Sequence, residues 1–227
     1  MSKGSFPVQF SREVSIPWRS EQFNPLLKAW YSNSVWVKLL RPFSYLFQLL
    51  ARKRRQDYVD RGNELWNPPV PVVVVGNINV GGTGKSPLVI WLAEQFRITG
   101  LKPGIVSRGY GGSAPQYPFE VTSTSAPGEA GEEAVMIARR TACPVVVDKN
   151  RTKAVQALLA DNECDIVICD DGLQHYALKR DVEIAVLDSK RGLGNGLCIP
   201  AGPLREPPAR LSEVDFVVVN GQEPLNL

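Results

Sequence analysis

The chain alternates between short apolar runs and segments in which apolar residues recur at helical spacing. The run 72–75 consists of four valines, a pattern typical of a strand buried on both faces of a parallel sheet. Helices are predicted at 88–98, 132–140 and 150–160, the last of them capped by Asn150. Further strands are predicted at 103–107, 144–147, 165–169, 182–187 and 214–219, with one short strand within 113–128. This alternation predicts an α/β fold with a mostly parallel sheet between helices.

The segment 35–55 has a different pattern, with apolar and basic positions on two sides of a predicted amphipathic helix. Pro42 is expected to start or kink this helix, because proline removes a backbone donor. Charged residues interrupt the apolar run well before the roughly 20 residues that a transmembrane helix needs. Four cations at 52–55 suit a helix lying on an anionic membrane surface, and docking on the protein's own core is the alternative. The apolar stripe comprises Trp36, Leu39, Leu40, Phe43, Leu46, Phe47 and Leu50, and the other face carries Lys38, Arg41, Gln48 and Arg52.

A glycine-rich turn follows the valine strand and leads into the next predicted helix. Its sequence resembles the pattern G-x-x-x-x-G-K-[ST], except that Asn79 replaces the first glycine. Glycines let successive backbone N–H groups point at one anion, and the helix N-terminus adds a partial positive charge. Lys85 is placed to reach the terminal phosphates, and the Ser86 hydroxyl is placed to ligate Mg²⁺. We therefore expect an ATP or GTP site in a P-loop NTPase-like three-layer fold, formed by Asn79, Val80, Gly81, Gly82, Thr83, Gly84, Lys85 and Ser86.

Composition and charge divide the chain into two predicted parts. The 227 residues are 44% apolar and 22% charged, which is ordinary for a globular protein with a sizeable core. Residues 1–66 carry 11 Lys and Arg against 5 Asp and Glu, whereas residues 67–227 carry 15 against 18. The boundary falls at the stiff sequence Asn-Pro-Pro of residues 67–69. The basic excess thus belongs to the N-terminal segment and not to the nucleotide-binding core, which argues against a nucleic-acid partner.

The four cysteines are expected to be reduced thiols of a cytosolic protein, since no two of them form a C-x-x-C pair. Use of these cysteines in a metal site or a disulfide is the alternative. The N-terminus shows no charged region followed directly by an apolar stretch and a cleavage site, so no signal peptide is predicted.

Charged residues follow several of the predicted strands, where a doubly wound sheet places its ligand contacts. Asp170 and Asp171 end the strand 165–169. Asp170 is expected to hold Mg²⁺ directly or through water, while Asp171 either orients an acceptor or pairs with Lys85. Arg108 follows the strand 103–107 in a glycine-rich loop and is placed to meet a phosphate, with a surface turn as the alternative.

Three other positions stay open from the residues alone. Glu132 and Glu133 lie in the first turn of a predicted helix, where carboxylates either compensate the helix dipole or act in catalysis. Lys149 and Arg151 face either the phosphates or the solvent. His175 follows the two aspartates closely and is either a structural residue or part of the site.

Four motifs, in this order along the chain, carry a family resemblance: GNINVGGTGKSP, SRGYGG, DDGLQHYALKRD and PAGPLRE. They resemble the tetraacyldisaccharide 4′-kinases of lipid A synthesis, and the resemblance runs from the N-terminal helix to about residue 220. It implies transfer of the ATP γ-phosphate, with Mg²⁺, to the 4′-hydroxyl of a tetraacylated glucosamine disaccharide 1-phosphate. It also implies peripheral attachment to the cytoplasmic face of the bacterial inner membrane, which holds the acceptor lipid.

The resemblance also implies roles for individual residues. Lys85 and the backbone of residues 80–86 hold the β- and γ-phosphates, while Ser86 and Asp170 hold Mg²⁺. Glu132 stands where the family has the acidic residue of a G-D-E motif, which acts as the base on the 4′-hydroxyl. The expected catalytic residues are therefore Glu132, Lys85 and Asp171, and the expected substrate-side residues are Arg108, Gln174, His175, Arg205 and Glu206.

Family members continue into a smaller C-terminal lobe that closes over the site and supplies a histidine partner to the base. This chain ends at Leu227 and its only histidine is His175, so we expect nucleotide binding to be retained better than turnover. One rival class is a membrane-associated switch of the partition-ATPase kind, whose loop carries a signature lysine where this chain has Asn79 and Val80. The other is a nucleotide-binding remnant, which acceptor-dependent ATP consumption would distinguish from a kinase, whereas the fold is common to all three.

Overall fold

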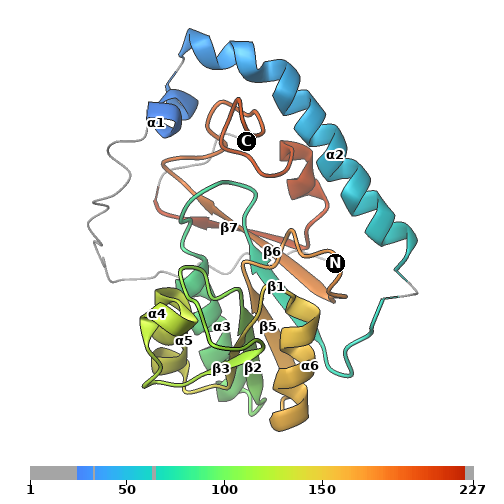
Figure 1. The fold of residues 1–227 in the computed structure, drawn as a ribbon, viewed down its shortest axis with the longest axis vertical. Coiled ribbons are helices and arrows are strands. Elements are labelled where there is room, and N and C mark those ends of the chain that lie inside the picture. The colour runs from blue at the N-terminus through green and yellow to red at the C-terminus, as the bar shows by residue number, and fades with distance from the viewer. Residues whose placement is uncertain (1–24, 33, 63–64, 223–227) are drawn as a thin grey trace, which may run out of the picture.

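The computed structural model describes residues 25–32, 34–62 and 65–222 (Figure 1). At the centre lies a seven-stranded sheet with the strand order β3-β4-β2-β5-β1-β6-β7. All neighbouring strands are parallel except β3, which runs antiparallel to β4. The strands are β1 (Val72–Gly76), β2 (Pro103–Ser107), β3 (Phe119–Val121), β4 (Val145–Val147), β5 (Ile166–Asp170), β6 (Val182–Asp188) and β7 (Phe216–Asn220). Every predicted strand is confirmed, with ends that shift by at most two residues.

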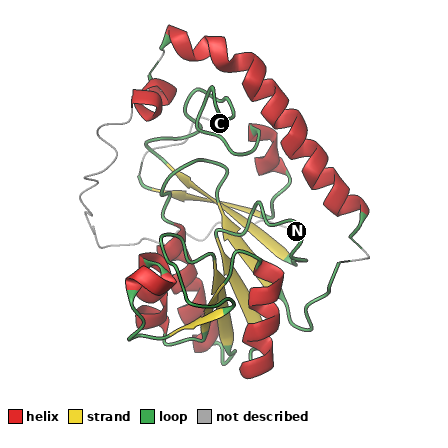
Figure 2. Cartoon of the chain, in the orientation of Figure 1, coloured by secondary structure: helices red, strands yellow, loops and turns green. Residues whose placement is uncertain are grey.

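Helices cover both faces of the sheet and complete three layers (Figure 2). Side chains alternate along β1, so that Val73 and Val75 pack on the side of α3 and α5, whereas Val72 and Val74 pack on the side of α6. The four consecutive valines are therefore buried on both faces, as predicted. The helices beyond β1 are α3 (Lys85–Ile98), α4 (Pro127–Ala130), α5 (Glu132–Thr141), α6 (Arg151–Asp161) and the 3₁₀ helix η3 (Pro208–Ser212).

The N-terminal part contains α1 (Pro25–Tyr31), the 3₁₀ helix η2 (Val35–Leu40) and α2 (Arg41–Asp60). The prediction of one helix over 35–55 is thus only partly right. Pro42 lies in the first turn of α2, where its missing N–H costs nothing, so a 3₁₀ helix precedes it and the α-helix continues further than expected. The short helices α1 and α4 were not predicted, because seven and four residues are too few to show helical periodicity.

Helix α2 runs along one flank of the molecule (Figure 1) and docks with the face that carries its buried residue, Ser44. On that face, the buried Ser44 hydroxyl donates a 2.8 Å hydrogen bond to the carbonyl oxygen of Cys198. Most of the predicted apolar stripe points away from the core, with Leu39 79% and Phe43 62% exposed. Of the helices that the structure describes, none has the length and apolar character required to cross a membrane.

The cysteines form no disulfide, which confirms the expected free thiols: Cys143, Cys169 and Cys198 are buried, and Cys164 is half-buried. Burial raises the pKa of the Cys198 thiol to about 11. It raises the pKa values of Cys143, Cys164 and Cys169 as well. Because the thiolate is the reactive form, these cysteines are packing residues at neutral pH.

Candidate active site

The loop of residues 77–84 connects β1 to α3 and is held in shape by its own hydrogen bonds. The amide of the buried Asn77 donates to the carbonyl oxygen of Gly81 at 3.1 Å and to the Thr83 hydroxyl at 3.2 Å. Gly84 precedes the helix with a φ of 89°, a left-handed conformation that glycine adopts without strain. This turn places Lys85 and the buried Ser86 in the first turn of α3, as the phosphate-cradle motif predicts.

The segment that contains Pro203 and Arg205 holds this loop through backbone hydrogen bonds. The backbone N–H of Val80 donates to the carbonyl oxygen of Pro203 at 2.8 Å, and the N–H of Arg205 donates to that of Ile78 at 2.6 Å. The side chain of Asn79 donates to the carbonyl oxygen of Gly192 at 2.8 Å. A glycine at this position would lack that bond, so the departure from the common motif ties the loop to the turn at residue 192.

Asp170 lies beside this loop because β5 pairs with β1 in a register that sets Val75 opposite Asp170. Its carboxylate is 1% exposed, and Oδ2 accepts a 3.1 Å hydrogen bond from the Ser107 hydroxyl. Burial, together with the charge of Glu133, raises the pKa of Asp170 to about 6, while Lys85 opposes this shift. The other oxygen, Oδ1, is buried without a hydrogen-bond partner, an arrangement that suits a bound cation.

Asp171 is the charge centre of the site, because two cations converge on it. Lys85 Nζ lies 3.3 Å from Asp171 Oδ1, and Arg205 Nη1 lies 3.3 Å from Oδ2. Burial by itself would raise the pKa of this carboxyl, but Lys85 and Arg205 outweigh burial and hold the pKa below its usual range. The predicted pairing of Asp171 with Lys85 is therefore confirmed.

Arg151 holds the backbone of Asp170 and Asp171 through hydrogen bonds. It is 1% exposed, and its guanidinium donates to the carbonyl oxygen of Asp148 at 2.7 Å and to those of Asp170 and Asp171 at 3.4 and 3.5 Å. Asp171 has a φ of 48°, which is uncommon for a residue with a side chain, and these bonds hold its backbone there. The expectation that Arg151 faces the phosphates or the solvent is thus wrong: the side chain is enclosed in the protein.

Gln174 and His175 line the next turn. Gln174 donates through Nε2 to the carbonyl oxygen of Asn77 at 2.9 Å and accepts through Oε1 from Arg205 at 3.3 Å. Burial, followed by the charges of Arg151 and the exposed Arg108, lowers the pKa of His175 to about 4. His175 is therefore a neutral imidazole at pH 7.

The two glutamates predicted as site residues, Glu132 and Glu206, differ in exposure. Glu132 is exposed at the first position of α5, and in the part of the chain that the structure describes no hydrogen bond or ion pair joins it to the other site residues. Its neighbour Glu133 is the one whose charge acts on Asp170. Glu206 is 3% exposed and accepts 2.7 Å hydrogen bonds from Gln174 Nε2 and the Tyr176 hydroxyl.

The structure thus brings Lys85, Asp170, Asp171, Gln174, Arg205 and Glu206 together at the ends of β1 and β5. Four further residues of this arrangement were absent from the sequence-based candidates, although three of them lie within the quoted motifs, because a motif does not say which of its side chains meet. They are Asn77, Ser107, Tyr176 and Arg210.

Comparisons with known proteins show which family the sequence resembles. A model of the tetraacyldisaccharide-1-P 4′-kinase family matches residues 36–226. The tetraacyldisaccharide 4′-kinase of Aeromonas salmonicida is 52% identical over 199 residues, which are 88% of this chain and 60% of that protein. The Haemophilus influenzae kinase is 51% identical over 85% of this chain and 58% of its own length. The chain therefore spans about three fifths of the curated relatives that it matches.

A solved structure shares the fold. It is LpxK from Aquifex aeolicus in complex with ATP, with a TM-score of 0.72 and 33% sequence identity. The match covers 82% of this chain and 59% of that one. The P-loop α/β fold that the sequence predicts is confirmed by this likeness and by the mostly parallel sheet.

Proposed function

The chain belongs to the tetraacyldisaccharide-1-P 4′-kinase family, and we propose that it transfers the γ-phosphate of ATP to the 4′-hydroxyl of a tetraacyldisaccharide 1-phosphate in lipid A biosynthesis. The observation that carries this proposal is the meeting of Lys85, Asp171 and Arg205 at the mouth of a loop built to cradle phosphates. The relative solved with ATP supports the choice of nucleotide. The residues 67–227 would then form the kinase core, and the residues 1–66 would form an attached N-terminal segment.

The residues present fit a magnesium ion. In the described part of the chain, no cluster of three or more His, Cys, Asp or Glu side chains forms a metal site of its own. Mg²⁺ is commonly held by one or two protein groups together with substrate phosphates, which the Ser86 hydroxyl and the unpartnered Asp170 Oδ1 match. When bound, Mg²⁺ would neutralise charge on the β- and γ-phosphates.

The chain's own groups would act mainly by positioning and charge. Lys85 and the N–H groups of residues 80–86 would hold the β- and γ-phosphates, and Arg205 would add positive charge on the same side. Arg108, Gln174 and His175 are proposed to face the acceptor side, with His175 acting as a neutral hydrogen-bonding group. Glu132 is proposed as the base on the 4′-hydroxyl by its place in the family motif.

The base assignment has its own test, a comparison of turnover by the parent with Glu132→Gln, Glu132→Asp and Glu133→Gln. Glutamine keeps the size of the side chain but accepts no proton, so we expect Glu132→Gln to lower turnover by about a hundredfold or more. An unchanged rate for Glu132→Gln together with a large loss for Glu133→Gln would transfer the role to Glu133, whose charge already acts on Asp170.

We further propose that α2 lies on the cytoplasmic face of the inner membrane. Its outward side exposes Phe43, Leu46, Leu49 and Leu50, next to the exposed Leu39 of η2, and the basic run 52–55 follows in α2. A helix with an exposed apolar side and adjacent cations binds to anionic lipid surfaces. Flotation with vesicles of anionic and of neutral lipid would test this, and equal binding of a Leu46→Glu, Leu50→Glu variant would contradict it.

The activity is tested by transfer of labelled γ-phosphate from ATP to tetraacyldisaccharide 1-phosphate in detergent micelles. We expect transfer that needs Mg²⁺ and acceptor and that Lys85→Ala abolishes, with Lys102→Ala as matched control, since Lys102 is exposed and pairs with Glu163. ATP consumption that ignores the acceptor would instead indicate a nucleotide-driven switch. Binding of Mg·ATP without transfer would contradict the activity of residues 1–227.

A further inference from the structure

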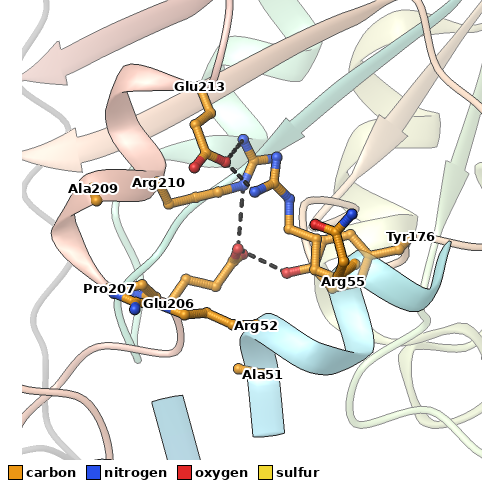
Figure 3. A pocket seen from close by; sticks show the side chains of 10 residues that line it. Ala51, Arg52, Arg55, Tyr176, Glu206, Pro207, Ala209, Arg210 and Glu213 are labelled. Atoms are coloured by element: carbon orange, nitrogen blue, oxygen red, sulfur yellow. Dashed lines mark hydrogen bonds and ion pairs between the residues drawn. The ribbon is translucent and has the colours of Figure 1, made fainter. Parts of the chain in front are cut away.

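Glu206 is buried, and both oxygens of its carboxylate have partners within the protein. Oε1 accepts from Gln174 Nε2 at 2.7 Å, and Oε2 accepts from the Tyr176 hydroxyl at 2.7 Å. Arg210 Nε lies 3.2 Å from the same Oε2, as an ion pair (Figure 3). Burial, and after it the charge and hydrogen bond of Glu206, raises the pKa of Tyr176, so the hydroxyl stays protonated as a donor.

Gln174 connects Glu206 to the phosphate loop and to Arg205 through hydrogen bonds. Its Nε2 donates to two acceptors, Glu206 and the carbonyl oxygen of Asn77, so the amide can only have its oxygen on the other side. That oxygen accepts from Arg205 Nη1 at 3.3 Å, and the same nitrogen faces Asp171. The orientation of one amide therefore fixes where the Arg205 guanidinium points.

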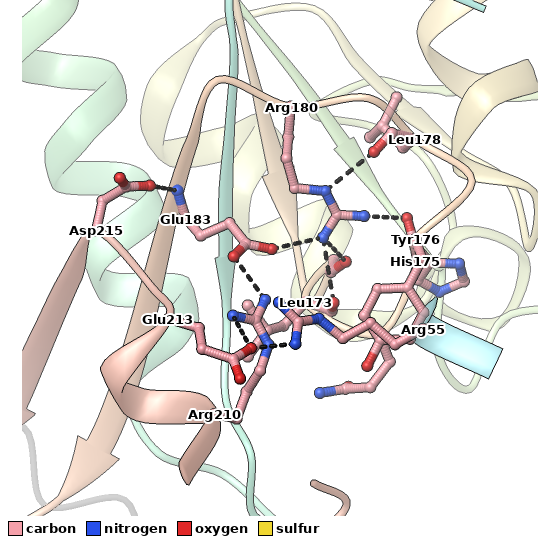
Figure 4. Close-up of polar contacts among 12 residues, drawn as sticks. Arg55, Leu173, His175, Tyr176, Leu178, Arg180, Glu183, Arg210, Glu213 and Asp215 are labelled. Carbon is pink, nitrogen blue, oxygen red and sulfur yellow. Dashed lines mark hydrogen bonds and ion pairs between the residues drawn. The ribbon is translucent and has the colours of Figure 1, made fainter. Parts of the chain in front are cut away.

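Arg210 is the cation that pairs with this buried carboxylate. Its side chain is 2% exposed and lies between Glu206 and Glu183, whose Oε2 is 2.5 Å from Arg210 Nη2. The half-buried Glu183 also pairs with Arg180 at 3.1 Å, so the charges of this group alternate in sign (Figure 4). An ionised carboxylate in such a place requires both hydrogen bonds and an opposite charge.

The group also reaches α2. Arg210 Nη1 lies 3.8 Å from Glu213, and Arg55 of α2 forms an ion pair with that same glutamate. A cavity of about 260 Å³ lies between α2 and η3 and is lined by Arg55, Tyr176, Glu206 and Arg210, but by no residue of the phosphate loop (Figure 3). Arg210 therefore occupies a position between the N-terminal helix and the site, outside direct reach of the nucleotide.

We propose that Arg210 is a positioning residue for phosphoryl transfer: by pairing with Glu206 it orients the Gln174 amide, which holds Arg205 against Asp171. This inference rests on the proposed kinase function for its effect on turnover, but not for its effect on the amide. It assigns Glu206 to the support of the site, in place of the substrate contact that the sequence motif suggests.

The test compares Arg210→Met, Arg210→Lys and the double variant Glu206→Gln, Arg210→Met in residues 1–227. Arg97→Met is the matched control, since Arg97 donates to the carbonyl oxygen of Thr141 on α5, away from Glu206. The first readout is the Gln174 side-chain amide in ¹H–¹⁵N spectra, assigned by its loss in Gln174→Glu. The second is the rate of γ-phosphate transfer with KM for ATP.

We expect Arg210→Met to shift the Gln174 amide signals, to speed their exchange with solvent, and to lower kcat by about tenfold or more, with KM for ATP within about twofold. Lysine should restore part of the rate. The kcat of the double variant should be about threefold or more above that of Arg210→Met, because the double variant no longer buries an unpaired carboxylate. The control should match the parent in both readouts.

Unchanged Gln174 signals in Arg210→Met, or a double variant no better than the single one, would overturn the proposal. If Arg210→Met does not fold, the lysine and double variants carry the same comparison. If the parent transfers no phosphate while the Gln174 signals still respond to Arg210, the proposed activity of this chain fails and the positioning role stands.

Discussion

Asp171 and Glu206 are both carboxylates with more than one partner, but they lie in different surroundings. The Asp171 side chain is 26% exposed, and its partners Lys85 and Arg205 are 11% and 30% exposed. The Glu206 side chain is 4% exposed, and its cationic partner Arg210 is 2% exposed. The first group of charges remains accessible to a phosphate, whereas the second is closed within the protein.

The difference shows how one protein uses the same chemistry in two ways. Charges that must bind a ligand keep some exposure. Solvent then screens their attraction for one another, and the charged groups remain available to the ligand. Buried charges must be fully paired, because an unpaired one is very costly, and they fix geometry more than they add stability. Variants that separate catalytic effects from effects on folding can therefore distinguish the two regions.

The largest effect is expected for Asp171→Asn. Without this carboxylate, Lys85 and Arg205 lose the charge that orients both of them, so we expect phosphate transfer to fall by about a hundredfold or more. The free energy of unfolding should change by less than about 1 kcal/mol, since the pairs are partly exposed. Transfer assays and thermal melts would be compared with Asp161→Asn, an exposed residue at the end of α6. A rate within threefold of the parent would contradict the central place of Asp171.

Asp170→Asn tests the accessible region through its pH dependence. Because burial raises the pKa of Asp170 to about 6 from its ordinary 3.8, the folded state favours the protonated form. The related stability is present below pH 4 and is lost as the pH rises through 6, at most about 3 kcal/mol. We therefore expect Asp170→Asn to melt several degrees higher than the parent at pH 8 but not at pH 4, while it loses Mg²⁺-dependent ATP binding. A Tm difference between Asp170→Asn and the parent that is the same at pH 4 and pH 8 would contradict the pKa shift.

The accessible region was largely predictable from the sequence, because its signals are local. The valine strand and the turn at 79–84 are continuous along the chain, the strand that ends in Asp170 shows its own apolar run, and parallel pairing brings the ends of the two strands together. The buried region was not, because Arg210, Tyr176 and Glu183 meet only after the chain has folded. No periodicity or spacing marks such contacts.

The same reasoning explains the individual errors. Arg151 follows a strand at a position where cations often meet ligands, so the sequence left its direction open, and only the packing of α6 shows that it is enclosed. The exposed apolar side of α2 was predicted as a stripe, but the face by which the helix docks depends on Ser44 and Arg55.

Arg151→Met examines the support beneath the two aspartates. The substitution keeps much of the volume but removes the donors to the carbonyl oxygens of Asp148, Asp170 and Asp171, so we expect a loss of about 2 kcal/mol in the free energy of unfolding. Urea unfolding would measure it. Arg139→Met is the matched control, since Arg139 also donates to a backbone oxygen but is exposed. Equal losses in both variants would show that the enclosed position of Arg151 adds nothing.

The smallest expected effect is a shift in the titration midpoint of His175, which can be followed directly. As the only histidine in the sequence, it gives one pair of imidazole C–H signals, Hδ2 and Hε1, in the ¹H spectrum. Burial and the charges of Arg151 and Arg108 lower its pKa to about 4, so these signals should stay constant from pH 8 to about pH 5 and shift only below that. Since the folded pKa is depressed, the related stability is present above the ordinary pKa and is lost as the pH falls through 4. We expect Arg108→Gln to move the midpoint upward, because it removes one of the positive charges that lower the pKa of His175. A midpoint near 6.5 in the parent would place the imidazole in water and contradict its neutral role beside the phosphate site.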